Sequence, residues 1–526
     1  MAEVISGAAP TNGSAPATIS ASEVYAVFGA EPEIQAYAMA KYSRSSLSMK
    51  ESLKEISSQK AEKFLNTFYF QYGHRSIADL AHIALAIERL SILAAIVLAD
   101  EQRWDGQERS TRYQDFRKSG YFTPDFGSDD ESRNLYQQTI TRLFSAYEAL
   151  SEKMFRYLAD ITSKPDEMKQ EAYDRTLRAR AFDISRYLLP LATNTSLGEI
   201  VNARTLETQV SHLLSHTHKE VRSLGEQLKR AATSAAYNVN HESLRKLVQE
   251  IREVSPELAA RAEAELLKDV RVAPTLVKYA DPNSYEIETR RELRQITAEL
   301  MRDVPVEPAP AVDLLDGEPL DVEMASTLLY EYCSYSYRQI RRGVGALSNA
   351  QRKEIIDTGL RHRGRHDEML RGFRAGQQFR FDILMDIGGF RDMHRHRRCI
   401  QIEQGVTTAH GYEIPPELAP AGALGDYQSA MDASSSAVKT LSDCNSPEAA
   451  ENSQYAIPLG FRKRTLFKMD FAEAAYISEL RTGPAGHTSY RNVAYAMFEE
   501  VKKKHPAMAD YIRVHDVHVP VDLLQR

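Results

Sequence analysis

Arg391–Gly405 reads RDMHRHRRCIQIEQG, and six of its first eight residues are arginine or histidine in a chain of formal net charge −7. The residues just before it, Gln378–Ile387, largely alternate apolar and polar side chains, which predicts a half-buried strand. A strand leading into dense cations favours a site for phosphate, carboxylate or an electron-rich ring, because guanidinium groups bind oxyanions bidentately and stay charged when desolvated. A solvated basic loop or a nucleic-acid patch would explain the same composition.

Bulk composition narrows the class of protein. The 526 residues are enough for two to four domains, and acids and bases are mixed along them, which argues against a general nucleic-acid binder. Cys333, Cys399 and Cys444 form no CxxC pair, so we expect neither a disulfide framework nor a metal site, and a cytoplasmic location. No apolar run reaches the roughly 18 residues of a membrane span. Residues 1–20 predict a disordered tail rather than a signal peptide.

The chain reads as two copies of one pattern. Residues 303–319, DVPVEPAPAVDLLDGEP, contain four prolines and no helical period, which predicts a linker between domains at 21–302 and 320–526. Leu188–Leu191 is echoed by Ala456–Leu459, with a proline third in each. Strands are expected at 197–201 and 378–387, and 84–99 fits a buried strand or helix. Helices are predicted at 48–72, 131–163, 168–189, 204–216, 219–236, 256–267, 287–301, 426–446, 470–480 and 489–503.

Both halves resemble the flavin-dependent thymidylate synthases, the ThyX family. The family signature is Arg-His-Arg, two residues, Ser, one residue, Asn-Glu, one residue, Ser, one residue, Arg-Tyr, with Gly-His-x-Ser/Thr upstream and Leu-Pro, Asn-Ala-Arg and Leu-Arg segments downstream. The resemblance covers roughly 45–235 and 325–505. It implies an α+β fold of two tandem ThyX-like domains, each a small, mostly antiparallel sheet flanked by long helices, and a homodimer that forms a pseudo-tetramer.

Each half keeps what the other has lost. In the first half Asp100-Glu101-Gln102 stand where Arg-His-Arg belongs. That half retains Gly73–Ser76, Glu108, Ser110, Arg112, Tyr113, Arg186, Asn202, Arg204 and His216. The second half has Arg395-His396-Arg397, Glu403, Leu480-Arg481 and His487. It carries Gly405, Thr407, Gln454 and Ala472 where the family has Ser, Arg, Arg and Arg. Complementary loss predicts one composite site built from both halves.

The resemblance implies roles for these residues. The catalytic group would comprise Arg481, Glu403 and Glu108. The FAD-binding group would comprise Arg395, His396, Arg397, His74, Ser76, Asn202, Arg204, His216 and His487. The nucleotide would be held by Ser110, Arg112, Arg186, Arg481 and Asp392. A surface ion-pair network for the arginines, and helix caps for Ser110 and His74, are the structural alternatives.

The implied reaction is reductive methylation of dUMP at C5, with FAD as cofactor and methylenetetrahydrofolate and NADPH as co-substrates. Asp392 stands three residues before Arg-His-Arg, where the family has a glutamine that helps to read the nucleotide. A related enzyme acting on another pyrimidine nucleotide is therefore the first alternative, and a non-catalytic flavin- or nucleotide-binding paralogue is the second. Asp100 and Glu101 would repel an anion, so we expect one working site and one flavin per chain.

Overall fold

A computed structural model describes residues 27, 29–41, 49–55, 75–317, 319–364, 370–373, 379–444, 448–510 and 512–524. The tail expected at 1–20, His74 and most of the helix predicted at 48–72 lie outside these residues. Within them, no helix is long and apolar enough to cross a bilayer.

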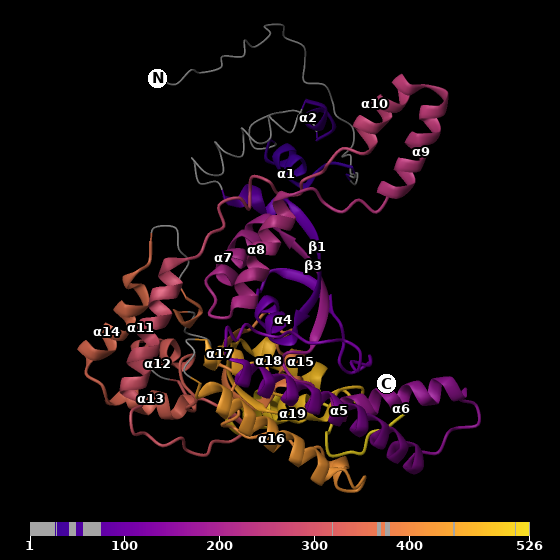
Figure 1. Cartoon of the computed structure of the whole chain (residues 1–526). Coiled ribbons are helices and arrows are strands. Elements are labelled where there is room, and N and C mark those ends of the chain that lie inside the picture. The colour runs from indigo at the N-terminus through magenta and orange to yellow at the C-terminus, as the bar shows by residue number, and fades with distance from the viewer. Residues whose placement is uncertain are drawn as a thin grey trace.

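The first half is built on a three-stranded antiparallel sheet in the order β1-β3-β2 (Figure 1). Its strands are β1 (His82–Ser91), β2 (Trp104–Glu108) and β3 (Asn194–Asn202). Its helices are α1 (Pro32–Lys41), α2 (Met49–Glu55), η2 (Arg75–Leu80), α4 (Ile92–Ala99), α5 (Asp130–Ile161), α6 (Gln170–Ser185), η3 (Arg186–Leu188), α7 (Ala203–Leu214), α8 (Lys219–Thr233), α9 (His241–Val254), α10 (Pro256–Leu266) and α11 (Ser284–Leu300). The ambiguous 84–99 is both strand and helix, because Ser91 accepts a hydrogen bond from Ala94 N and so caps α4 at its N-terminus.

The second half repeats this order around a four-stranded antiparallel sheet, β4-β5-β7-β6. Its strands are β4 (Val312–Leu314), β5 (Phe379–Asp386), β6 (Ile400–Glu403) and β7 (Arg462–Met469). Its helices are α12 (Leu320–Tyr330), α13 (Tyr337–Ala346), α14 (Asn349–Arg361), η4 (Arg371–Phe373), α15 (Ile387–Met393), η5 (Pro416–Leu418), α16 (Leu424–Ser442), α17 (Ala449–Gln454), α18 (Phe471–Arg481), α19 (Thr488–Lys504) and α20 (Pro506–Ala509). The unit β1-α4-β2…β3-α7-α8 corresponds to β5-α15-β6…β7-α18-α19, and the last strand lies between the other two in both halves. The predicted α+β repeat is therefore present, while the number of chains in the assembly stays a prediction.

The two Leu-Pro segments meet at a pseudo-twofold axis. Leu191 N donates to Ile457 O at 2.9 Å, and reciprocally Leu459 N donates to Leu189 O at 2.9 Å, with Pro190 and Pro458 paired between them. The halves thus join through the same segment used twice, which is the pattern of an isologous interface.

One hydrophobic core runs through this junction. Tyr187, Leu189 and Leu191 belong to the same buried cluster as Tyr427 and Phe461. The long helices α5 and α16 lie side by side on the outside of it (Figure 1). Burial of one continuous core fixes the halves against each other and so positions residues from both at shared sites.

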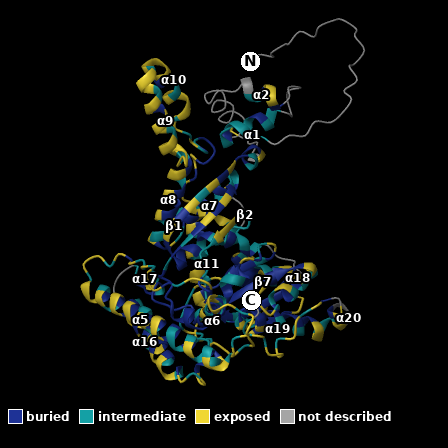
Figure 2. Ribbon diagram, turned by 90° about the vertical axis from the view of Figure 1, so that its right-hand side faces the viewer, coloured by how far each residue is buried: buried dark blue, intermediate teal, exposed yellow. Residues whose placement is uncertain are grey.

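The domain boundary at 303–319 stays a prediction, although part of that range has structure of its own. Val312–Leu314 forms β4 and pairs with β5, and α11 packs against α12 and α14 through Leu293 and Met301. Further from the core, α9 and α10 form a hairpin that projects from the first half and is largely exposed (Figure 2).

The sequence pattern did not indicate β7. Its residues Arg462–Met469 include four cations, yet all but the first are buried (Figure 2). Lys463 pairs with Glu403, Arg464 Nη1 donates to Asp382 Oδ2 at 3.0 Å, and Lys468 Nζ donates to Glu323 Oε1 at 3.2 Å. Buried charges require such partners, and these partners lie more than 50 residues away in sequence, where no local pattern reveals them.

Candidate functional site

The buried guanidinium of Arg112 joins the two halves. It follows β2, and its Nε donates to Asp183 Oδ1 of α6 at 2.7 Å. Its Nη1 donates to Tyr490 OH of α19 at 2.8 Å, and its Nη2 to Ala485 O at 3.2 Å. Burial alone would lower the pKa of Arg112, but the Asp183 carboxylate reverses that shift and holds the pKa above its ordinary value. Arg112 is therefore a fixed cation that reaches across the junction.

Arg481, the last residue of α18, also lies beside Tyr490. Its guanidinium carbon is 5.5 Å from the centre of the Tyr490 ring, and that of Arg112 is 5.6 Å away. Arg481 Nε donates to His396 Nε2 at 2.8 Å. Burial lowers the pKa of His396, which fits an imidazole whose Nε2 accepts a hydrogen bond. Tyr490 thus holds one arginine from each half.

Arg391 and Arg397 link the signature stretch to β2 of the first half. Arg391 Nη2 donates to Glu108 Oε1 at 2.5 Å. Arg397 Nη2 donates to Asp105 Oδ1 at 3.2 Å, and its guanidinium carbon lies 5.2 Å from the centre of the Trp104 ring. The lone tryptophan therefore serves as a platform for a signature arginine.

Arg186 is the most unusual of these groups. Only 2% of its surface is exposed, and its Nε and Nη2 have no hydrogen-bond partner among the described residues. Its ion pair with Asp392 is long, 3.8 Å from Arg186 Nη1 to Asp392 Oδ2. A buried guanidinium with unpaired N–H groups is costly, so the site is built to receive an acceptor.

These residues form what we call the arginine cluster: Arg112, Arg186, Arg391, Arg397, Arg481, His396 and Asp392. Arg391 Nε and Arg397 Nη1 are also buried without partners. Arg395 is exposed beside the cluster and, through its charge, lowers the pKa of Arg481 after the larger effect of burial. A dense set of cations with unpaired donors can bind a phosphate and an anionic ring, and its residues come from both halves.

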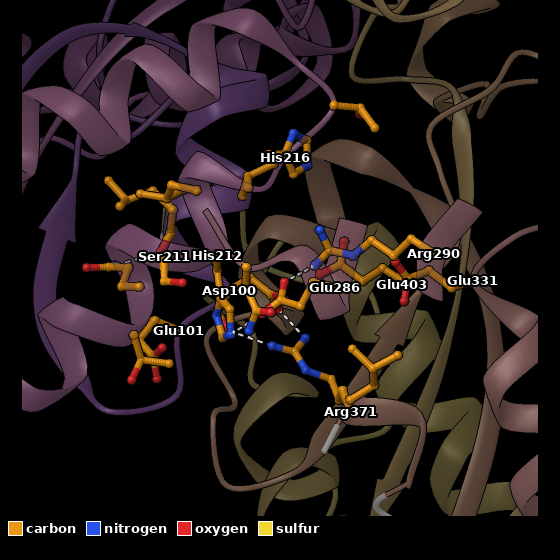
Figure 3. A pocket seen from close by; sticks show the side chains of 18 of the residues that line it. Asp100, Glu101, Ser211, His212, His216, Glu286, Arg290, Glu331, Arg371 and Glu403 are labelled. Carbon is orange, nitrogen blue, oxygen red and sulfur yellow. Dashed lines mark hydrogen bonds and ion pairs between the residues drawn. The ribbon is translucent and has the colours of Figure 1, made fainter. Parts of the chain in front are cut away.

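The pseudo-twofold counterpart of the arginine cluster is a cavity of about 1060 Å³, which we call the twin pocket. Asp100–Gln102, between α4 and β2, occupies the place that Arg395–Arg397 has between α15 and β6. Figure 3 shows Asp100, Glu101, Glu331 and Glu403 among the side chains around this cavity. Asp100 and Glu101, which we expected to repel an anion, therefore line a cavity to which both halves contribute residues.

The predicted residues divide between the two sites. Arg204 and His216 line the twin pocket, while Arg395–Arg397 are not among its described lining residues. Glu403, predicted to act with Glu108, also lies in the twin pocket, where Lys463 and His394 among its neighbours hold the pKa of its carboxyl group at about 2 against the opposing effect of burial. One chain therefore does not bring the whole predicted flavin set together.

The remaining predicted residues have structural partners. Asn202 Oδ1 accepts from Thr205 N at 2.9 Å and caps α7, and Arg204 Nη1 donates to Asp79 Oδ2 at 3.1 Å. Ser110 Oγ accepts from Arg112 N at 3.3 Å. His487 caps α19, and burial lowers its pKa to about 3. Ser76 is exposed in η2.

Sequence reasoning missed Asp183, Tyr490 and Arg391 as members of the site. Arg391 stood inside the quoted stretch, so the cation density could have indicated it. Asp183 and Tyr490 lie on α6 and α19, and only the hydrogen bonds that Arg112 makes to both reveal them.

Fold and site together define a tandem α+β protein with a cluster of buried cationic side chains shared between its halves. The family model described as thymidylate synthase complementing protein matches residues 26–236 and 321–507, one segment in each half. The chain belongs to this family.

Curated relatives are of two kinds. A UPF0159 protein of Chlamydia muridarum is 28% identical over 470 residues, which cover 88% of this chain and 82% of the relative. A UPF0159 protein of Thermoplasma acidophilum is 23% identical and covers 88% and 90%. A flavin-dependent thymidylate synthase of Clostridium tetani is 24% identical over 211 residues, which cover 40% of this chain and 80% of that protein. The last alignment has the length expected for one half.

Two solved structures are similar at a lower level. The flavin-dependent thymidylate synthase ThyX of Helicobacter pylori, complexed with FAD and dUMP, has a TM-score of 0.23 and 16% identity and covers 38% of this chain and 89% of that one. The UMP/dUMP methylase PolB of Streptomyces cacaoi, bound with 5-Br dUMP, has a TM-score of 0.27 and 16% identity and covers 38% and 84%.

Proposed function

We propose that this chain is a flavin-dependent methyltransferase that methylates a pyrimidine nucleotide, with dUMP as the expected acceptor, in the arginine cluster. Membership of the thymidylate synthase complementing protein family and the relative in Clostridium tetani support this reaction class. The carbon would come from methylenetetrahydrofolate and the hydride from NADPH. The transferred methylene is reduced to methyl by that hydride, and C5 loses its hydrogen as a proton.

The observation that carries the proposal is Arg186. Among the described residues its buried guanidinium has no partner for the N–H groups at Nε and Nη2, and its Nη1 lies 3.8 Å from Asp392 Oδ2 of the second half. A nucleotide phosphate has the acceptor oxygens to satisfy these donors bidentately. Arg112, already fixed by Asp183, would add a second charge. Both of these arginines belong to the first half, and Tyr490 of the second half holds Arg112 in place by a hydrogen bond.

The donors near the signature stretch fit FAD. Arg397 Nη1 and Arg391 Nε are buried and unpaired, and Arg395 is exposed beside them, so an anionic flavin or its pyrophosphate would find partners. When bound, FAD supplies the redox chemistry that the side chains lack. The residues of this chain would hold it with Arg395, His396 and Arg397, keep His396 neutral, and place the nucleotide between Arg112 and Arg481.

Absorbance and turnover test the proposal. The purified protein should be yellow and should oxidise NADPH faster when dUMP is added. The double variant Arg395→Ala/Arg397→Ala should lose the flavin. The matched control is Arg398→Ala, because Arg398 is exposed and pairs with Asp470 outside the cluster. A double variant that remains as yellow as the wild type contradicts the assignment, and flavin without dUMP-stimulated oxidation favours a non-catalytic paralogue.

Another pyrimidine nucleotide is the second candidate, and Asp392 favours it. Its carboxylate can only accept hydrogen bonds, whereas the glutamine of the family can also donate them. Initial rates with dUMP, UMP and dCMP compare the acceptors directly. If Asp392 sets the choice, Asp392→Gln should shift the preference towards dUMP. If Asp392→Gln leaves the ranking of the three acceptors unchanged, Asp392 does not set the choice of nucleotide.

We also propose that two chains complete the flavin site. Ser76, Asn202 and Arg204 lie on the first half beside η2, apart from Arg395–Arg397 in the described chain, and a second copy would supply them. Light scattering should give the mass of a dimer, and titration of the apo-protein should bind about one FAD per chain. Two equivalent flavins per chain would contradict this proposal.

A further inference from the structure

The twin pocket and the arginine cluster differ in whether their unpaired buried groups are hydrogen-bond donors or acceptors. Among the described residues of the arginine cluster, the buried side-chain atoms without a hydrogen-bond partner are donors, on Arg186, Arg391 and Arg397. Among the described residues of the twin pocket they include two amide oxygens, Gln209 Oε1 and Gln404 Oε1. The same architecture, used twice, therefore offers hydrogen-bond donors on one side of the junction and acceptors on the other.

The orientation of both amides is fixed by their surroundings. Gln209 Nε2 donates to Leu98 O at 3.2 Å and to Glu199 Oε1 at 2.9 Å, and Gln404 Nε2 donates to Tyr335 O at 2.8 Å. Because the backbone carbonyls of Leu98 and Tyr335 only accept, the amide nitrogens must face them and the amide oxygens must face away. Gln209 is 3% exposed and Gln404 is 2% exposed, so each leaves a buried acceptor at the cavity.

Glu331 adds a negative charge to this wall. It caps the C-terminus of α12, where the helix dipole disfavours an anion, and it lines the cavity. Its side chain is exposed to the cavity, while desolvation by the surrounding protein raises the pKa of its carboxyl group. Arg290 and Arg371 act on it through their charges, but within the described part of the chain neither lies close enough to form an ion pair with Glu331.

Arg371, Arg290 and Lys463, which line the pocket, are committed to other acids. Arg371 Nη1 donates to Asp100 Oδ1 at 2.5 Å, and Arg290 Nη2 donates to Glu286 Oε2 at 2.8 Å. Lys463 pairs with Glu403. Figure 3 labels Glu403, Asp100, Arg371, Glu286 and Arg290 around the cavity. Glu101 uses Oε1 to accept from Gln102 N at 2.7 Å and lies across the cavity on the first half.

We propose that the twin pocket binds an aliphatic polyamine. Acceptors stand on walls from both halves, Gln209 and Glu101 on one and Gln404 and Glu331 on the other, so the ligand needs several separated N–H donors. Ammonium groups joined by a methylene chain supply them, and a cavity of about 1060 Å³ has room for such a chain. An anion is disfavoured here by Glu101 and Glu331, which separates this site from the arginine cluster.

A metal ion is the competing occupant. Ligand atoms of Asp100, His394 and Glu403 lie within 4.8 Å of one another, and His394 Nε2 has no hydrogen-bond partner among the described residues. However, Arg371 and Lys463 already neutralise the two carboxylates, and a divalent cation placed beside them would be repelled. Glu331, with neutral amide oxygens nearby, suits an ammonium group better.

Isothermal titration calorimetry with spermidine on the full chain tests the proposal. We expect one saturable site per chain, and saturating dUMP should leave the affinity unchanged because the two sites are separate. Glu331→Gln should weaken binding at least tenfold. Glu299→Gln, an exposed carboxylate on α11 outside the pocket lining, is the matched control and should bind as the wild type does.

The outcomes are distinct. If Glu331→Gln does not fold, Glu101→Gln takes its place and should weaken binding at least threefold. The absence of saturable binding up to millimolar spermidine, or equal binding by the wild type and the pocket variants, overturns the proposal. So does one tight Mn²⁺ site that His394→Ala abolishes while spermidine does not bind. A protein without flavin or methylation activity leaves this test intact, because the titration requires neither.

Discussion

Replacing Arg186 by methionine should make the protein more stable and remove nucleotide binding. Only 2% of the Arg186 surface is exposed, and among the described residues two of its side-chain nitrogens have no hydrogen-bond partner. Methionine has a similar length and no donors, so the packing at the junction is largely kept. The variant separates the cost of a functional cation from its benefit.

The expected gain follows from the unpaired donors. Each buried unpaired polar group costs about 1–3 kcal/mol, and partial loss of packing opposes its removal, so we expect a net gain of about 1–3 kcal/mol. Unfolding entropy is about 2.1 cal/mol/K per residue, or roughly 1.1 kcal/mol/K for 526 residues. Arg186→Met should therefore raise Tm by about 1–3 °C.

Differential scanning calorimetry with and without dUMP measures both effects. A ligand that binds only the folded state raises Tm, so dUMP should stabilise the wild type and leave Arg186→Met unchanged. Arg112→Met is the matched control. It leaves Asp183 buried without its cation and should cost about 3–5 kcal/mol, which lowers Tm by about 3–5 °C.

The test is that Arg186→Met raises Tm whereas Arg112→Met lowers it, although both arginines are buried in the same site. A ligand-free Arg186→Met protein with a lower Tm than the wild type would mean that an unseen partner satisfies this side chain. An equal rise of Tm with dUMP in both proteins would place the nucleotide elsewhere. Either result refutes the role assigned to Arg186.

Three further predictions concern the frame of the site. Gly460→Ala at the junction would place Cβ 2.8 Å from Tyr427 OH and should cost about 1–3 kcal/mol in urea unfolding, whereas Gly405→Ala, with no heavy atom within 4 Å, should be neutral. The folded pKa of His487, about 3, lies below its unfolded value of about 6.5, so unfolded chains bind more protons as pH falls and stability is lost. Between pH 6.5 and 5 the free energy of unfolding of the wild type should fall by about 2 kcal/mol more than that of His487→Asn, which keeps a helix cap. An equal dependence of unfolding free energy on pH in both proteins would contradict this. Asp382→Asn leaves Arg464 buried without a carboxylate and should cost about 3–5 kcal/mol by chemical denaturation, with no change expected only if Arg464 finds another acceptor.

Local sequence patterns predicted most of the long helices and the strands β3 and β5, but not β2, β4, β6 or β7. Strands with alternating or apolar residues, such as β3 and β5, and amphipathic helices such as α5 were found because burial of one face repeats along the sequence. The strand β7 was missed because its buried cations are matched by distant acids. The repeat itself was recognisable because both halves kept the order of their motifs.

The site was only partly predictable for a different reason. Motifs identified Arg112, Arg186 and Arg481 as partners across the halves, and the fold brings them together. Motifs could not tell which residues share a site when a site is assembled across an interface. Arg204 and Arg395 were therefore grouped, although the described chain places Arg204 at the twin pocket.

The reciprocal pairing of Leu189–Leu191 with Ile457–Leu459 has a consequence for dilute protein. Were the halves separate molecules, this contact would form only above its dissociation constant. Joined in one chain, each half meets the other at an effective local concentration that dilution does not change. Covalent linkage also allows the two faces of the contact to diverge, because each half has its own sequence and a substitution in one half leaves the other unchanged.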